Sequence, residues 1–155
     1  MINLFQKLFL VKEIKSKGGV LHFRRYRLLW TPWFAIYIHR IYKSDDDLHP
    51  HSHPWNFISL ILSGAYCEEL YKQELDQVSI VERWFWTTKY NVFLPLSIGK
   101  RNRHQFHRIT TLIGPVTSLV LTYGKCSGWG YKVGGQYVDF KKYRENKKDG
   151  LYEES

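Results

Sequence analysis

Aromatic and β-branched residues alternate with polar ones in short runs along most of the chain, as is typical of β-strands. The runs that we expect to form strands are residues 21–29, 34–42, 57–71, 78–88, 91–94, 105–111, 116–123 and 137–140. Ser63-Gly64 interrupts the third run, which therefore predicts strand, turn and strand.

The two ends of the chain depart from this pattern. Between Ile2 and Ile14, apolar residues recur at helix-like spacing, which predicts a short amphipathic N-terminal helix ended by Gly18-Gly19. The tail after residue 140 is polar and is compatible with a helix.

Short strands without long segments for crossover helices indicate an all-β fold with antiparallel strands, a sandwich or a barrel. The 155 residues suit a single domain, 1–155, with the barrel at roughly residues 20–140. The composition adds 6 Trp, 11 Tyr and 9 Phe, so the chain has apolar surface to bury and is not disordered.

Neither a membrane span nor a secretory signal is expected. The most apolar window, residues 57–65, falls well short of the roughly twenty residues that cross a bilayer. The first residues lack the charged region and cleavage site of a signal peptide. The expected compartment is therefore cytoplasmic, where a structural disulfide between Cys67 and Cys126 is not expected. Neither cysteine has zinc or redox spacing, and Cys67 is expected to be a buried small hydrophobe.

Basic residues outnumber acidic ones by 23 to 14, which gives a net charge of +9. Such an excess permits binding to nucleic acid, to a membrane surface or to a small anion. The basic residues are scattered, with small clusters at residues 24–27, 100–103 and 141–144. We therefore expect mainly a solvated basic face, with a small-molecule substrate as partner; specific nucleic-acid binding and membrane binding are not expected.

Five of the seven histidines lie in two segments, DDDLHPHSHPW and RNRHQFHRI. His51 and His53 alternate in an extended segment, so their side chains share a face and can offer two nitrogens to one ion. His107, in a later strand, could complete a set that leaves coordination positions open. The alternative is a turn fixed by Pro50 and Pro54, with exposed histidines and no metal.

The segment HSHPWNFISLILSGAY resembles the first motif of the cupin superfamily, in which HxH is followed by a Glu and then by a Gly. His51, His53 and Gly64 match, whereas Phe57 or Ile58 stands at the position of the Glu. The second cupin motif retains only its histidine. The residues concerned are His107, which matches, and Asn102, His104 and Thr111, which replace the other motif residues.

More narrowly, the pattern HxHPW-x-F-x-S, L-x-G-x-Y-x-E, HRI and WGY is similar to a group of small cupin-like proteins of bacteria and phages. The resemblance covers roughly Tyr37 to Tyr131. It implies a double-stranded β-helix, or jelly-roll barrel, and says little about the reaction. Cupins often pair through their sheets, so a homodimer is allowed.

The resemblance also implies a metal set. Cupin thiol dioxygenases hold Fe(II) with three histidines and no carboxylate, so it permits His51, His53 and His107 as sufficient ligands for Fe(II), with Zn, Ni or Mn as alternatives. Cys67 does not fall at the cross-linking cysteine position of those enzymes. The alternatives for a further ligand are His49 and His104. Either Glu68 or Glu69 can face the site, but not both, because neighbours in a strand alternate.

The remaining candidates are assigned by type. The catalytic candidates are Tyr66, Glu69 and Tyr123; the substrate-binding candidates are Arg101, Arg103, Trp55 and Trp129. For the aromatic residues the alternative is a place in the core, and for the arginines it is a solvated cluster. Arg108 is expected to point away from His107.

The leading function is a metal-dependent cupin enzyme, an Fe(II) dioxygenase-type oxidoreductase acting on a small polar or anionic molecule. One alternative is a metal-free cupin isomerase or epimerase of a sugar or nucleotide-sugar, with a histidine base and a tyrosine acid such as Tyr123. The other is a non-enzymatic basic binding module of phage origin.

Overall fold

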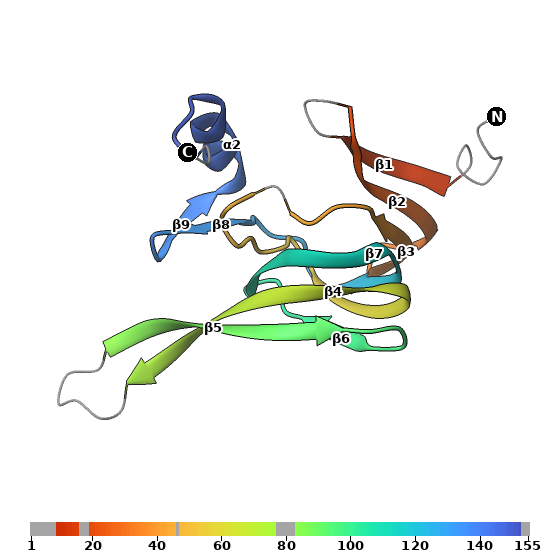
Figure 1. The fold of residues 1–155 in the computed structure, drawn as a ribbon, viewed down its shortest axis with the longest axis horizontal. Helices are drawn as coiled ribbons and strands as arrows, with labels where there is room; N and C mark the ends of the chain where they lie inside the picture. Colours follow the sequence, from red (N-terminus) through yellow and green to blue (C-terminus); the bar gives the residue numbers. More distant parts are fainter. Residues whose placement is uncertain (1–8, 16–18, 46, 77–82, 153–155) are drawn as a thin grey trace.

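The strands dominate the structure, a computed structural model that describes residues 9–15, 19–45, 47–76 and 83–152 (Figure 1). They are β1 (Leu10–Lys15), β2 (Leu21–Trp30), β3 (Phe34–Ile41), β4 (Asn56–Asp76), β5 (Arg83–Phe93), β6 (Ile98–Arg101), β7 (Phe106–Tyr123), β8 (Gly130–Val133) and β9 (Gln136–Asp139), followed by helix α2 (Phe140–Lys148).

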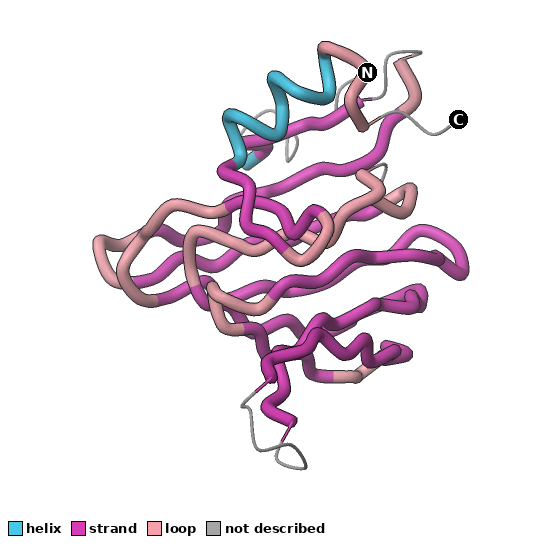
Figure 2. The backbone as a smooth tube through the Cα atoms, turned by 90° about the vertical axis from the view of Figure 1, so that its left-hand side faces the viewer, coloured by secondary structure: helices cyan, strands magenta, loops and turns pink. Residues whose placement is uncertain are grey.

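A seven-stranded antiparallel sheet runs in the order β1-β2-β3-β7-β4-β5. β4 is so long that β5 pairs with its second half and β6 with its first half. β8 and β9 form a separate hairpin beside α2 (Figures 1 and 2). The antiparallel, mostly β class is confirmed. Closure into a jelly-roll barrel is not seen in the described part of the chain, where β1 and β5 do not pair with each other.

Gly64 lies within a continuous β4 and not at the predicted turn. The register of β4 against β7 shifts on both sides of Ser63, which marks a β-bulge. Gly64 has a φ of +75°, a conformation that favours glycine, and a bulge interrupts the apolar pattern as a turn would. The two runs predicted at 105–111 and 116–123 are likewise one strand, β7.

The N-terminal segment corrects the helix prediction. Leu10–Lys15 form β1, which pairs antiparallel with β2 and places Glu13 opposite Arg24. Arg24 Nε donates to the Glu13 carboxylate at 2.6 Å. Pairing of polar residues across an exposed edge therefore overrides the helical spacing. Residues 2–8 of the expected helix lie outside the described residues.

One face of the sheet carries the core. Val116, Ser118, Val120 and Thr122 alternate along β7 as buried residues, and Ser118 lies opposite the buried Ile61 of β4. Removing side chains such as Val116 and Ile61 from water contributes roughly 1.5–3 kcal/mol each. We call this side of the sheet the inner face.

The C-terminal helix docks through aromatic stacking. α2 begins after Asp139, whose side chain accepts a hydrogen bond from Lys141 N at 2.9 Å. Tyr143 is fully buried, with its ring 3.6 Å from the Tyr131 ring and 4.7 Å from the Tyr152 ring. Among the described residues, no helix has the length and apolar character that a membrane crossing requires.

Candidate metal centre

Backbone pairing holds two of the candidate ligands side by side. His51 N donates to His107 O at 2.9 Å, and His107 N donates to His51 O at 3.0 Å. On the other side of the same segment, Ser52 N donates to Gly130 O and Lys132 N to Pro50 O, both at 2.9 Å. The segment around His51 therefore lies as a short strand between β7 and β8, which fixes its histidine from both sides.

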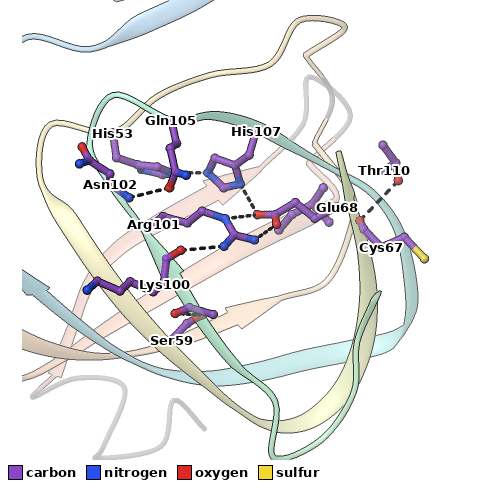
Figure 3. A network of polar contacts seen from close by, with 12 residues as sticks. His53, Ser59, Cys67, Glu68, Lys100, Arg101, Asn102, Gln105, His107 and Thr110 are labelled. Atoms are coloured by element: carbon purple, nitrogen blue, oxygen red, sulfur yellow. Dashed lines mark hydrogen bonds and ion pairs between the residues drawn. The ribbon is translucent and has the colours of Figure 1, made fainter. Parts of the chain in front are cut away.

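Three histidines converge at this point. One ring nitrogen each from His51, His53 and His107 lies within 4.8 Å of the others. The His53 and His107 Nε2 atoms are 2.7 Å apart (Figure 3). The Phe57 ring packs edge-on against His53 at 4.9 Å. The structure therefore brings together the three histidines that the sequence singled out.

Glu68 on β4 orients His107. The Glu68 Oε1 atom lies 2.6 Å from His107 Nδ1. Glu68 is buried, with only 2% of the residue exposed. Arg101 pairs with the same carboxylate, with Nε 3.1 Å from Oε1 (Figure 3). An ionised carboxylate can only accept, so the proton lies on Nδ1 and the Nε2 lone pair faces the cluster. A carboxylate behind a histidine in this way is typical of metal ligands.

Burial keeps the three histidines uncharged at neutral pH. It lowers the pKa of His107 to about 4, with Asp45 acting in the opposite direction and Arg101 lowering it further. Burial lowers the pKa of His51 and holds that of His53 well below its usual value. Neutral imidazoles have lone pairs to give, and three of them suit a divalent transition metal. His51 Nδ1 is buried without a hydrogen-bond partner in the described part of the protein, which also fits a ligand role.

The other two histidine candidates stand apart from this cluster. His49 Nδ1 lies 3.1 Å from the Tyr143 hydroxyl, and its ring packs on Tyr152. His104 is exposed and accepts a hydrogen bond from Arg103 Nε at 3.1 Å. The structure therefore gives neither a place as a fourth ligand.

The two glutamates divide as strand alternation requires. Glu68 faces His107, whereas Glu69 lies 3.3 Å from Arg108 and accepts from the Tyr71 hydroxyl at 3.4 Å. Glu68 is therefore the glutamate that faces the cluster, whereas Glu69, predicted as a catalytic candidate, points away from His107. Arg108 points away from His107, as expected, and donates to Leu48 O.

The aromatic candidates take different places. Tyr66 is buried and stacks on Phe93 at 4.9 Å in the core, and Tyr123 alternates away from the buried face of β7. Trp129 reaches the site, with its ring 6.3 Å from that of His51, and it stacks on Phe140. Trp55 lies against the Arg25 guanidinium at 5.8 Å.

The two arginines predicted to bind substrate are engaged within the protein. Arg101 is 8% exposed and is committed to Glu68 and to Lys100 O. Arg103 donates to Lys125 O at 2.9 Å and to His104. The Glu68–Arg101 pair was not predicted, because the spacing of the two residues does not tell which strands lie side by side.

The Glu68–Arg101 pair can be tested by a mutant cycle. Arg101→Met should lower the free energy of unfolding by about 3 kcal/mol, because it leaves a buried carboxylate without its cation. Adding Glu68→Gln to that variant should restore at least half of the loss. Urea denaturation measures both, with Arg103→Met as the control. A double variant no more stable than Arg101→Met would contradict the pairing.

Asp47 ties the segment before the histidines to the C-terminal helix. It accepts hydrogen bonds from the Tyr131 hydroxyl at 2.7 Å and from Lys147 Nζ at 2.6 Å. Burial raises the pKa of Asp47, but the bonds from Lys147 and Tyr131 outweigh it, so the pKa lies below its usual value. The resulting stabilisation is present above about pH 4 and is lost as the pH falls through the lower native pKa.

Asp47→Asn should therefore lower the free energy of unfolding by about 1 kcal/mol at pH 7, a figure reduced for partial solvent screening. It should also flatten the acid limb of the wild-type stability profile. Urea titrations between pH 7 and pH 3 check this, with Lys148→Met as a control that leaves the contact in place. A variant with the wild-type acid limb would refute the assignment.

Solved structures share the fold. The iron(II) form of the epoxidase HppE with substrate superposes with a TM-score of 0.54 at 12% identity, covering 79% of this chain and 60% of that one. The hydroxypropylphosphonic acid epoxidase from S. wedmorenis gives 0.50 at 13% identity, covering 72% and 55%. A cupin superfamily protein from Desulfitobacterium hafniense has a lower TM-score, 0.44, at 12% identity, covering 73% of this chain and 83% of that one.

The likeness to the epoxidase, at 12–13% identity, shows a shared fold and nothing finer. The chain spans little more than half the length of the epoxidase chains that it matches. Comparison of the sequence with known families and with curated proteins finds no match.

Proposed function

We propose that the protein is a metal-dependent enzyme of the cupin type, in which His51, His53 and His107 hold a divalent ion. Fe(II) is the metal that we favour. The observation that carries the proposal is the convergence of three neutral imidazoles, two half-buried and one, His107, buried and oriented by Glu68. Three protein ligands leave coordination positions free for substrate. A ferrous ion so held would supply the redox chemistry of a dioxygenase acting on a small polar or anionic molecule.

The chain's own residues prepare this site. Glu68 keeps the proton of His107 on Nδ1, and Arg101 keeps Glu68 ionised, so the Nε2 lone pair is directed at the cluster before any ion binds. Phe57 packs edge-on against His53, and the Trp129 ring lies beside that of His51. Solved structures of the epoxidase, which shares the fold, contain iron(II). This supports Fe(II) as a metal that the fold can hold.

Elemental analysis of protein purified without a metal-binding tag tests the proposal. We expect close to one transition-metal ion per chain, with iron prevailing when oxygen is excluded during purification. Chelation followed by reloading with Fe(II), Zn, Ni or Mn then ranks the affinities. Protein that arrives without metal and takes up none of the four would overturn the metal assignment.

One observation favours a second candidate, the metal-free isomerase or epimerase. The 2.7 Å contact between the His53 and His107 Nε2 atoms requires a proton on one of them, so the pair could pass a proton to or from a substrate. Tyr123 does not face the buried side of β7 and is a poor choice for the acid. Isomerase activity that survives complete chelation would favour this candidate over the oxidoreductase.

A further inference from the structure

A row of directly paired residues crosses the sheet and ends in the core. Lys12 of β1 is paired with Arg25 of β2, Arg25 with His39 of β3, His39 with Ser118 of β7, and Ser118 with Ile61 of β4. Residues paired in this way have side chains on the same face. Ser118 and Ile61 are 4% and 1% exposed, so Arg25 and His39 lie on the inner face.

Arg25 is held in place by neutral groups. Its Nε donates to His39 Nε2 at 2.9 Å. Its guanidinium lies 5.1 Å from the centre of the Tyr37 ring, 5.6 Å from that of Phe23 and 5.8 Å from that of Trp55. Aromatic rings at these distances orient a guanidinium without neutralising it. Its planar fork is thereby fixed in direction.

No acidic group neutralises Arg25 among the residues that the structure describes. Its side chain donates through Nε, and its terminal nitrogens have no hydrogen-bond acceptor among the described residues. The neighbouring charge in the row is another cation, Lys12, with no acidic partner in the same ranges. Burial lowers the pKa of Arg25, because it disfavours the charged form of the guanidinium. Burial of a cation is unfavourable unless an opposite charge accompanies it.

This cation lies beside the histidine cluster. Trp55, which packs on Arg25, is two residues from His53. Phe57, which packs on His53, pairs with the buried Thr122 on the inner face of β7. Arg25 and His53 therefore lie over the same face of the sheet.

We propose that Arg25, with Lys12 beside it, binds an oxyanion of the substrate next to His53, so that the substrate class is a small carboxylate or phosphate-type anion. The inference rests on the proposed function, because it takes the histidine cluster as the place where the rest of the molecule reacts. A planar guanidinium with free terminal N–H groups binds two oxygens of such an anion at once. This role replaces the one predicted for Arg101 and Arg103.

Titration calorimetry with inorganic phosphate as the probe tests the proposal, on chelator-treated protein so that phosphate does not bind a metal. We expect a dissociation constant on the order of 1 mM for the wild type. Arg25→Gln should weaken phosphate binding at least tenfold. Arg25→Lys, which keeps the charge but loses the fork, should weaken it several-fold. Arg24→Gln is the matched control, because Arg24 carries the same charge one residue away and pairs with Glu13.

The outcomes separate this proposal from the metal assignment. Equal phosphate binding by Arg25→Gln, Arg25→Lys and the wild type, or no binding by the wild type at millimolar phosphate, would overturn the oxyanion site. The metal content of Arg25→Gln should equal that of the wild type. A chain that holds phosphate through Arg25 but never holds metal would refute the proposed function and leave the anion site standing.

Discussion

Replacing His107 with alanine is expected to strip the bound metal almost completely while the β-rich circular dichroism spectrum stays nearly unchanged. Two imidazoles remain, and loss of a direct ligand should cost more than the roughly 10–100-fold in affinity that loss of an orienting partner costs. The fold should persist because the backbone N–H and C=O of His107 pair with His51 whatever the side chain. Elemental analysis with circular dichroism on the same samples measures both effects.

The matched controls are His104→Ala and His49→Ala, which remove histidines that lie outside the cluster. Both should keep the wild-type metal content, and His51→Ala and His53→Ala should behave like His107→Ala. Full metal occupancy in His107→Ala would refute the three-histidine centre.

Gly64→Val is expected to abolish folding, with a loss of at least about 5 kcal/mol, a value on the scale of the total stability of a small domain. A Cβ at Gly64 would lie 2.4 Å from Pro115 O and 2.9 Å from Val116 Cα, which are backbone atoms of β7. Its φ of +75° adds strain for a β-branched residue. Expression tests and thermal unfolding measure the loss.

Gly114 supplies the control, because its φ is +73° but a Cβ there would meet nothing within 4 Å. Gly114→Ala should cost only about 1 kcal/mol, from backbone strain alone. Gly64→Ala should cost several times more, and the difference isolates the clash with β7. A soluble Gly64→Val protein with the wild-type melting temperature would contradict the close approach of β4 and β7.

The sequence predicted the β class because alternation is a local property of each strand. It failed at residues 10–15, where six residues of mixed polarity fit either period and only pairing with β2 decides between them. It also missed β6 and β8, strands of only four residues, which are too short to show a clear alternating pattern. The reading of a turn at Gly64 failed because a bulge and a turn call for the same residue.

Some residues of the site could likewise be predicted from local spacing, and others depend on how the strands pair. The HxH spacing and a later histidine on a strand were enough to select the cluster, since metal ligands on strands follow from alternation. The choice between Glu68 and Glu69 depended on the phase of β4 after its bulge, which a local pattern does not contain. Arg25 was not singled out, because Arg24 and Arg27 lie close to it in the sequence. Only the register across β1, β2 and β3 shows that Arg25 faces inward.

The backbone hydrogen bonds between His51 and His107 fix where these two ligand positions lie, whichever side chains stand there. Both residues are held by main-chain atoms that any amino acid other than proline supplies, so the side chain at position 51 can be exchanged without moving the frame. An aspartate there would turn three imidazoles into the two-histidine, one-carboxylate set used by many non-haem iron oxygenases. Because the backbone hydrogen bonds hold this short strand in place, the metal preference of the site can be changed by replacing one side chain at a time.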